Sequence, residues 1–251
     1  MVMPGFVNHS TADTPSTGFD ARLQSTVRVL ARINSDFNPA VFTSSFSIED
    51  CVLADLLAIH APQVGVITFD TGRLPQETHD LIAAYAARGA AIRVLAPESG
   101  DVESWVDSYG VNGFRNSLQA RRDCCHVRKV LPLNRALAGN RAWLTGLRRA
   151  QSADRQSLLL ESFDAERGIQ KFNPLLDWSD TEVRQYAQEH DLPVHALYAR
   201  GYTSIGCAPC TRAVTVGEDV RAGRWWWEEQ TVKECGLHAR PQQVIGNEVT
   251  A

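Results

Sequence analysis

The stretch AVFTSSFSIEDCVLADLLAIH, residues 40–60, decides the fold class of this 251-residue chain. Residues 40–45 have the apolar content of a buried strand, and residues 49–60 have the length and apolar content of a helix. A serine-rich turn, residues 44–50, joins the two. A strand that leads through a short turn into a helix is the repeating unit of α/β proteins, so we expect a parallel sheet to begin here.

The same alternation of strands and helices continues along the chain. Apolar spacing predicts further helices at residues 19–37, 75–88, 101–109, 115–138 and 179–190. Further strands are expected at residues 64–69, 91–96, 142–147, 157–163 and 169–175. In the last helix Ser179 and Glu182 have the spacing of a capping box. The order of elements predicts an α/β domain over residues 19–210, with a doubly wound, mostly parallel sheet.

The two ends of the chain depart from this pattern. Residues 1–18 are rich in Ser, Thr and Pro, and we expect them to be disordered. Residues 211–251 lose the strand pattern and are predicted to form a mobile helical tail. A secretory signal and an apolar run of the ~20 residues that span a bilayer are both missing from the sequence.

The charge and the cellular setting narrow the function classes. The net charge of −4 argues against a general nucleic-acid-binding surface. We expect a cytoplasmic protein that binds neither nucleic acid nor a membrane, in a compartment where thiols stay reduced. A homo-oligomer is compatible with the sequence, which does not specify the oligomeric state.

Four of the six cysteines form two pairs, Cys124-Cys125 and Cys207-Ala208-Pro209-Cys210. Four thiols can hold zinc or an iron–sulfur cluster. Zinc ligands are usually spaced by two to four residues, and adjacent side chains point in different directions on a regular backbone. A cubane offers several irons where zinc offers one point. The spacing therefore favours a [4Fe–4S] cluster over zinc and over unligated thiols.

The two remaining cysteines have different surroundings. Cys51 lies among apolar residues of a predicted helix and is expected in the core. Cys235 lies in the polar tail, where Lys233 and His238 favour the nucleophilic thiolate and Glu234 opposes it. From these residues alone, Cys235 is either a catalytic nucleophile or an incidental surface thiol.

Two loops and a group of arginines indicate a small anionic substrate. The turn with Ser45 and Ser47 offers hydroxyls and backbone N–H groups to a phosphate at a helix N-terminus, although helix capping by Ser47 is the alternative. Asp70-Thr71-Gly72-Arg73 closes the next strand at the same edge of the sheet, where ligands bind in open α/β proteins. Basic residues also gather near the cysteine pairs: Arg121, Arg122, Arg128, Lys129, Arg148, Arg149, Arg155, Arg221 and Arg224.

The combination of these motifs resembles the assimilatory adenylyl-sulfate (APS) and phosphoadenylyl-sulfate (PAPS) reductases. The motifs that carry the resemblance span roughly residues 40–240 and are SFSIED at 45–50, DTGR at 70–73, CCHVRK at 124–129, TGLRR at 145–149, CAPC at 207–210 and ECGLH at 234–238. The two cysteine pairs are similar to those of the bacterial branch that carries a [4Fe–4S] cluster. That branch typically reduces APS, whereas the branch without the cluster uses PAPS.

The resemblance implies a fold of the adenine-nucleotide α-hydrolase type and a covalent mechanism. Cys235 would attack the sulfate sulfur of APS and expel AMP, and thioredoxin would then release sulfite from the S-sulfocysteine. It implies cluster ligation by Cys124, Cys125, Cys207 and Cys210. It also implies a set of substrate-binding residues. Ser45 and Ser47 would contact the phosphate, and Asp70, Thr71, Gly72 and Arg73 would contact the adenosine. Lys129 would lie between cluster and substrate, Arg148, Arg221 and Arg224 would bind the phosphosulfate, and Gly146 is a further substrate-binding position.

Several alternatives remain at this point. Arg149 and Arg155 are weaker candidates for the anion site, because their register is not fixed by the sequence. Trp225-Trp226-Trp227 is expected to anchor the tail, with thioredoxin docking as the alternative. The rival functions are a PAPS reductase, an adenylating enzyme of the ATP-pyrophosphatase type, and a metal-binding protein without catalysis. The ECGLH tail argues against the adenylating enzyme.

Overall fold

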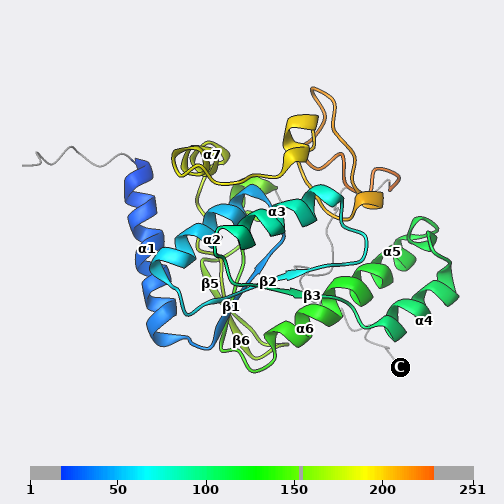
Figure 1. Ribbon diagram of the computed structural model, residues 1–251, viewed down its shortest axis with the longest axis horizontal. Helices are drawn as coiled ribbons and strands as arrows, with labels where there is room; N and C mark the ends of the chain where they lie inside the picture. Colours follow the sequence, from blue (N-terminus) through cyan, green and yellow to red (C-terminus); the bar gives the residue numbers. More distant parts are fainter. Residues whose placement is uncertain (1–17, 153–154, 229–251) are drawn as a thin grey trace, which may run out of the picture.

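A six-stranded sheet forms the centre of the protein in the computed structural model, which describes residues 18–152 and 155–228 (Figure 1). Its strands are β1 (Ala40–Ser44), β2 (Gly65–Phe69), β3 (Ile92–Leu95), β4 (Ala142–Leu144), β5 (Glu161–Asp164) and β6 (Ile169–Phe172). They lie in the order β3-β2-β1-β4-β6-β5, and all neighbours are parallel except the edge pair β5 and β6. The predicted α/β class with a mostly parallel sheet is confirmed.

Helices cover both faces of this sheet (Figure 1). The α-helices are α1 (Gly18–Asp36), α2 (Ile48–His60), α3 (Gln76–Ala87), α4 (Ser99–Tyr109), α5 (Leu118–Cys125), α6 (Leu131–Leu137) and α7 (Asp180–Glu189). Shorter helical turns are η1 (Gly113–Arg115), η2 (His126–Val130), η3 (Arg149–Gln151), η5 (Ala196–Arg200) and η6 (Ala208–Cys210). The Ser179–Glu182 capping box at the start of α7 is present as predicted.

The single helix predicted over residues 115–138 is divided. Ser117 begins α5 by accepting a hydrogen bond from the backbone N–H of Ala120. A π-helical turn, η2, follows Cys125, and α6 begins with Pro132 near its first position. The π turn inserts extra backbone between the cysteine pair and α6, and single π turns of this kind are frequent at functional sites.

The core forms because side chains of a strand alternate between the two faces of the sheet. Phe42 packs with α1, α2 and α7 on one face, and its neighbour Val41 packs with α6 on the other. Leu144 and Trp143 divide in the same way on β4. The sheet is therefore buried on both faces, and a ligand can approach only at its edges.

The strand order places a binding edge between β1 and β4. From β1 the chain proceeds outward through β2 and β3, and it then returns to the other side of β1 to form β4. In open α/β sheets such a switch point opens a crevice at the carboxyl ends of the two strands. The serine-rich turn follows β1, and Thr145 and Gly146 follow β4, so both lie at this crevice.

The chain beyond Cys210 differs from the helical tail that was predicted. Residues 211–228 contain no helix and fold back on themselves, with an isolated antiparallel bridge between Thr211 and Arg224. Gly223 permits this return, because a Cβ there would lie 2.3 Å from the carbonyl oxygen of Arg212. Residues 229–251 and 1–17, which include the expected disordered end and the rest of the tail, lie outside the described residues. Among the helices described, none has the length and apolar content needed to cross a membrane.

Candidate active site

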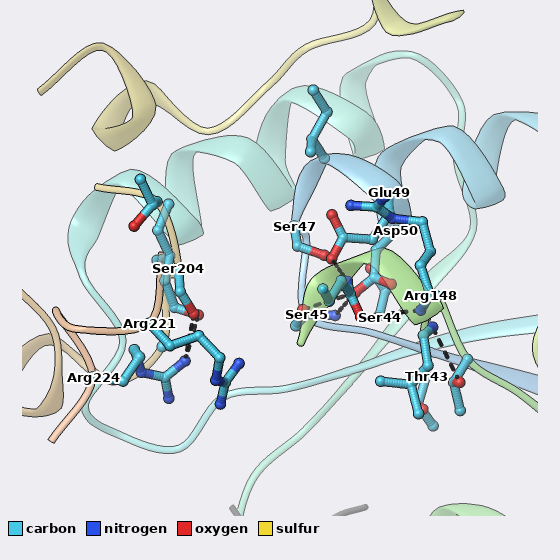
Figure 2. Close-up of a pocket in the computed structure, with 18 of the residues that line it drawn as sticks. Thr43, Ser44, Ser45, Ser47, Glu49, Asp50, Arg148, Ser204, Arg221 and Arg224 are labelled. Carbon is cyan, nitrogen blue, oxygen red and sulfur yellow. Dashed lines mark hydrogen bonds between the residues drawn. The ribbon is translucent and has the colours of Figure 1, made fainter. Parts of the chain in front are cut away.

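A cavity of about 330 Å³ opens at the carboxyl ends of β1 and β4, at the switch point of the sheet. One wall is the serine-rich turn with Ser45, Ser47 and the end of β4 (Figure 2). The opposite wall carries Ser204, Arg221 and Arg224. The cavity therefore has serine hydroxyls, a helix N-terminus and Arg148 on one side, and Ser204 with two further guanidinium groups on the other, a combination suited to a ligand with anionic groups (Figure 2).

The serine-rich turn is shaped for ligand contact rather than for helix capping. Phe46 adopts a left-handed conformation (φ 57°) and is buried, which reverses the chain between the two serines. Ser47 occupies the N-cap position of α2, but its side chain makes no capping hydrogen bond. The alternative that Ser47 serves as a side-chain cap is therefore wrong, and its hydroxyl faces the cavity lining.

Asp50 holds this turn in place from within the first turn of α2. Its Oδ2 accepts hydrogen bonds from the backbone N–H of Ser45 at 2.6 Å and from the Ser45 hydroxyl at 2.8 Å. Burial, with a further contribution from the nearby charge of Glu49, raises the pKa of Asp50 to about 7. A Cβ on Gly146 would lie 2.1 Å from Asp50 Oδ1, so the end of β4 approaches this carboxyl as closely as only glycine allows.

Four of the arginines noted in the sequence line the cavity, namely Arg148, Arg155, Arg221 and Arg224. Arg148 is buried, with Nη1 donating to the carbonyl of Trp178 at 3.0 Å and Nη2 pairing with Asp180 at 2.5 Å. Arg155 lines the cavity and donates to Gln151, and Arg224 donates to the carbonyl of Ile205 at 3.3 Å. Arg149 is absent from the lining and pairs with an exposed aspartate. The structure thus places Arg148 and Arg155, but not Arg149, at the cavity.

Only part of the predicted 70–73 loop reaches the cavity wall. Thr71 lines the cavity, and its Oγ1 lies 3.2 Å from the sulfur of Cys207. Asp70 pairs instead with His79 at 3.2 Å, and Arg73 donates to the carbonyl of Val111. Asp70, Gly72 and Arg73 do not line the cavity. Through Thr71, the loop contacts both the cavity and the sulfur of Cys207.

The two cysteine pairs, far apart in sequence, come together beside the cavity. One apolar cluster contains Cys124, Cys207 and Cys210 together with Trp105, Phe114 and Trp225. Cys125 follows Cys124 at the end of α5 and is half-buried. Each of these four thiols is free of a disulfide. Over residues 18–152 and 155–228, no three His, Cys, Asp or Glu side chains are grouped closely enough for a single metal ion.

Lys129 lies between the cysteines and the cavity. It belongs to the π turn η2 that follows Cys125, and its side chain lines the cavity. Burial raises the pKa of Cys210 to about 12, and the positive charge of Lys129 acts in the opposite direction. Arg128 of the same turn is buried and donates to the carbonyl of Thr71 at 2.7 Å.

The remaining predicted positions are the two unpaired cysteines and the tryptophans of residues 225–227. Cys51 is fully buried, as predicted for a core residue. Trp225 is buried beside the thiols, as expected of an anchor, whereas Trp226 is 38% exposed. Cys235 lies outside the described residues, seven positions after Glu228.

Sequence reasoning missed several cavity residues. They include Thr43, Thr68, Trp143, Tyr198 and the segment 203–206, and the specific role of Asp50 within the predicted turn was also missed. The signal for Thr43 and Thr68 was their position at the ends of β1 and β2, where polar residues interrupt apolar strands. The Tyr198 hydroxyl, from the distant short helix η5, accepts a hydrogen bond from the backbone N–H of Ile48 at the start of α2 at 3.1 Å. Nothing in the local sequence indicates this contact.

The comparisons with known proteins agree with this geometry. The family described as "Phosphoadenosine phosphosulfate reductase domain" matches residues 39–213. The chain is 47% identical over 215 residues to the adenosine 5'-phosphosulfate reductase of Allochromatium vinosum, which covers 85% of this chain and 84% of the relative. It is 50% identical over 200 residues to the corresponding reductase of Agrobacterium fabrum, covering 79% and 77% of the two chains.

A solved structure shares the fold. The phosphoadenylyl-sulfate reductase of Candida auris, in a phosphate complex, superposes with a TM-score of 0.63 at 26% identity and covers 81% of this chain and 100% of that chain. The family match includes the serine-rich turn, both cysteine pairs and the cavity lining up to Gly206, but not Arg221 and Arg224. On these grounds the chain belongs to the phosphoadenosine phosphosulfate reductase family.

Proposed function

We propose that this protein is an adenosine 5'-phosphosulfate reductase, which reduces adenylyl sulfate to sulfite with release of AMP. In this reaction the Cys235 thiolate attacks the sulfate sulfur, the bond from sulfur to the bridging oxygen breaks, and AMP leaves with that oxygen. A dithiol reductant, thioredoxin, then attacks the S-sulfocysteine, releases sulfite and is itself oxidised to a disulfide. Relatives of this name are 47% and 50% identical to the chain over most of its length.

The observation that carries the proposal is the division of the cavity into two anion-recognising walls. Ser45 and Ser47 lie with the N-terminus of α2 on one side, and Arg221 and Arg224 lie on the other (Figure 2). A nucleotide phosphate placed at the turn would extend its sulfate toward the arginines. Guanidinium groups suit this role because they keep their charge and donate two hydrogen bonds to one oxyanion.

Other residues fit supporting roles around this substrate. Arg148 lines the cavity with its Nε buried and without a hydrogen-bond partner, so it has a donor left to offer. Gly146 leaves space for the Asp50 carboxyl that fixes the turn. Thr71 lines the cavity. Asp70, Gly72 and Arg73 do not, so they could contact the adenosine only if it extends outside the cavity. Lys129 lies between the cavity and the thiols. We propose that its positive charge stabilises the AMP that leaves and the sulfonate that stays on Cys235.

Cys235 is proposed as the nucleophile, because its position in the chain lets it reach the cavity. Glu228 is the last described residue, and Trp225 lines the cavity. Seven extended residues span up to about 24 Å, a length that allows Cys235 to return to the cavity wall lined by Trp225. For thioredoxin to reach the same sulfur, we propose that the segment from Thr211 moves as a lid between the two half-reactions.

The four paired thiols fit a [4Fe–4S] cluster better than a single ion. Cys124, Cys207 and Cys210 share one apolar cluster, and the half-buried Cys125 follows Cys124 directly. Among the residues that the structure describes, no three of these thiols are grouped for one metal ion, whereas a cluster offers four separate attachment points. The indole N–H of Trp225, in the same apolar cluster, is buried without a hydrogen-bond partner. A cluster ligated by Cys124, Cys125, Cys207 and Cys210 would supply sulfur acceptors for such a donor. When bound, it would stabilise the site and shape its electric field. Because these thiols and Cys235 must stay reduced, we also propose a cytoplasmic location.

A sulfite-release assay with reduced thioredoxin tests the function. The purified protein should form sulfite and AMP from APS, and omission of thioredoxin should abolish turnover. A higher kcat/KM for PAPS would reassign the substrate without changing the chemistry. Pyrophosphate release from ATP in place of sulfite formation would indicate an adenylating enzyme and refute the proposal.

A further inference from the structure

A buried ion pair joins the cysteine-bearing helix to the segment that leads to Cys235. Arg121 of α5 donates from Nε to Glu228 Oε1 at 2.5 Å and from Nη2 to Oε2 at 3.1 Å. The two side chains are only 2% and 8% exposed. A two-point contact between a guanidinium and a carboxylate fixes orientation as well as distance.

Trp225 extends this contact toward the cavity. The guanidinium groups of Arg121 and Arg224 both lie over its ring, with Cζ at 4.4 and 4.6 Å from the ring centroid. The backbone N–H of Trp225 donates to the carbonyl of Cys210 at 3.2 Å. Residues 224–228 are therefore attached to both cysteine pairs, through Arg121 on one side and through Cys210 on the other.

Arg121, Arg224 and Glu228 each lie next to a different part of the proposed active site. Arg121 precedes Cys124 by three residues, so both lie on one face of α5. Arg224 lies in the arginine wall of the cavity, where a Cβ on Gly206 would come within 2.4 Å of its Nη2. Glu228 is seven residues before Cys235. One chain of contacts thus runs from the thiol helix to the anion site and to the start of the nucleophile's segment.

We infer that Arg121 and Glu228 are positioning residues: their ion pair, acting through Trp225, sets the position of Arg224 in the cavity and the starting point of the segment that carries Cys235. This inference rests on the proposed function and assigns a task to residues that touch neither substrate nor nucleophile. The helix α5 with its cysteines is the fixed part, and residues 224–228 follow it. Breaking the pair should release these residues without displacing the thiols.

The test is Glu228→Gln, which keeps the shape and one acceptor but removes the charge. AMP lacks the sulfate that the arginine wall is proposed to hold, so its affinity should stay unchanged in calorimetry. APS affinity, measured in a Cys235→Ser background, should fall by at least about tenfold, the loss expected when a charge-assisted contact is broken. Single-turnover AMP release from APS should slow in the Cys235-containing variant, and the iron content and visible spectrum should match those of the unsubstituted protein.

A matched control lies in the same segment. Arg212 and Glu218 form an ion pair at 2.7 Å, but their side chains are 36% and 30% exposed and are absent from the cavity lining. Glu218→Gln should leave APS affinity, AMP affinity and single-turnover rate unchanged. A fall in APS affinity in this control as large as in Glu228→Gln would overturn the assignment to the buried pair.

A second variant separates positioning from packing. Replacing a buried ion pair by apolar residues of similar volume often preserves or increases stability. Arg121→Met combined with Glu228→Leu should therefore fold and keep its iron, yet show the same selective loss of APS affinity. Full APS affinity in this double variant, or equal loss of AMP and APS affinity or of iron in Glu228→Gln, would overturn the inference. Failure of the proposed function would show instead in the unsubstituted protein, which would release no AMP from APS.

Discussion

Replacing Gly146 by alanine should damage the phosphate turn through a single side chain. A Cβ at this position would lie 2.1 Å from Asp50 Oδ1, 3.3 Å from its Cγ and 3.4 Å from Glu49 Cγ. The Asp50 carboxyl would have to rotate or withdraw. It is buried, and the Ser45 hydroxyl and backbone N–H both depend on it, so the movement would disturb the turn that faces the nucleotide.

The expected magnitude follows from these contacts. Adding a methyl group to a packed interior costs about 1–3 kcal/mol of unfolding free energy. Loss of one hydrogen bond to a charged group costs about 1.5–3 kcal/mol. If that loss appears in ligand binding, AMP affinity falls by roughly 10-fold to 150-fold. The loss of AMP affinity in Gly146→Ala should therefore be larger than a loss of folding stability alone would cause.

Calorimetric titration with AMP and urea unfolding measure the two effects separately. Gly100→Ala serves as the control, because Gly100 lies in α4 and a Cβ built on it meets no atom within 4 Å apart from its chain neighbours and the backbone of its own helix. Alanine is favoured over glycine within helices by roughly 0.5–1 kcal/mol, so this variant should be at least as stable as the parent and bind AMP normally. If Gly146→Ala binds AMP as tightly as the parent, the proposed link between Gly146, Asp50 and the phosphate turn is wrong.

Three further predictions concern the carboxyl, the thiols and the substrate. Burial raises the pKa of Asp50 to about 7, so between about pH 4 and pH 7 the folded protein keeps a proton that the unfolded chain has lost. The stability that this group contributes is therefore fully present below about pH 4 and is lost as the pH rises through about 7. Asp50→Asn should flatten this part of the dependence of the unfolding free energy, measured with urea, on pH. Anaerobically purified protein should contain about four irons per chain, and Cys207→Ser should lower that content, whereas stoichiometric zinc without iron would contradict the cluster. The kcat/KM should be higher for APS than for PAPS, and the reverse order would show that the cavity accepts a 3'-phosphate.

The sheet was predictable because its signals are local. The strand and turn of residues 40–50 and the capping box at Ser179 and Glu182 each report on a few neighbouring residues, and all of them are present. The division of the helix expected at 115–138 was less accessible. It depends on the cap at Ser117 and on the π turn after Cys125, whose geometry reflects packing against distant residues.

The site was predictable by residue type more than by arrangement. Polar side chains at strand ends and paired cysteines indicated a nucleotide site beside a thiol cluster. The role of Asp50 depends on Gly146, almost a hundred residues later, and no local pattern connects the two. The helical reading of the chain after Cys210 was wrong for residues 211–228, because Gly223 and the contact of Trp225 with Cys210 turn the segment back on the fold.

Trapping the covalent intermediate tests the central claim most directly. The protein is incubated with APS in the absence of reductant, and the released AMP and the mass of cysteine-containing peptides are measured. We predict about one AMP per chain and a sulfonate adduct on Cys235, with neither in Cys235→Ser. An adduct on another cysteine, or sulfite release by Cys235→Ser at the parent rate when thioredoxin is supplied, would contradict the account.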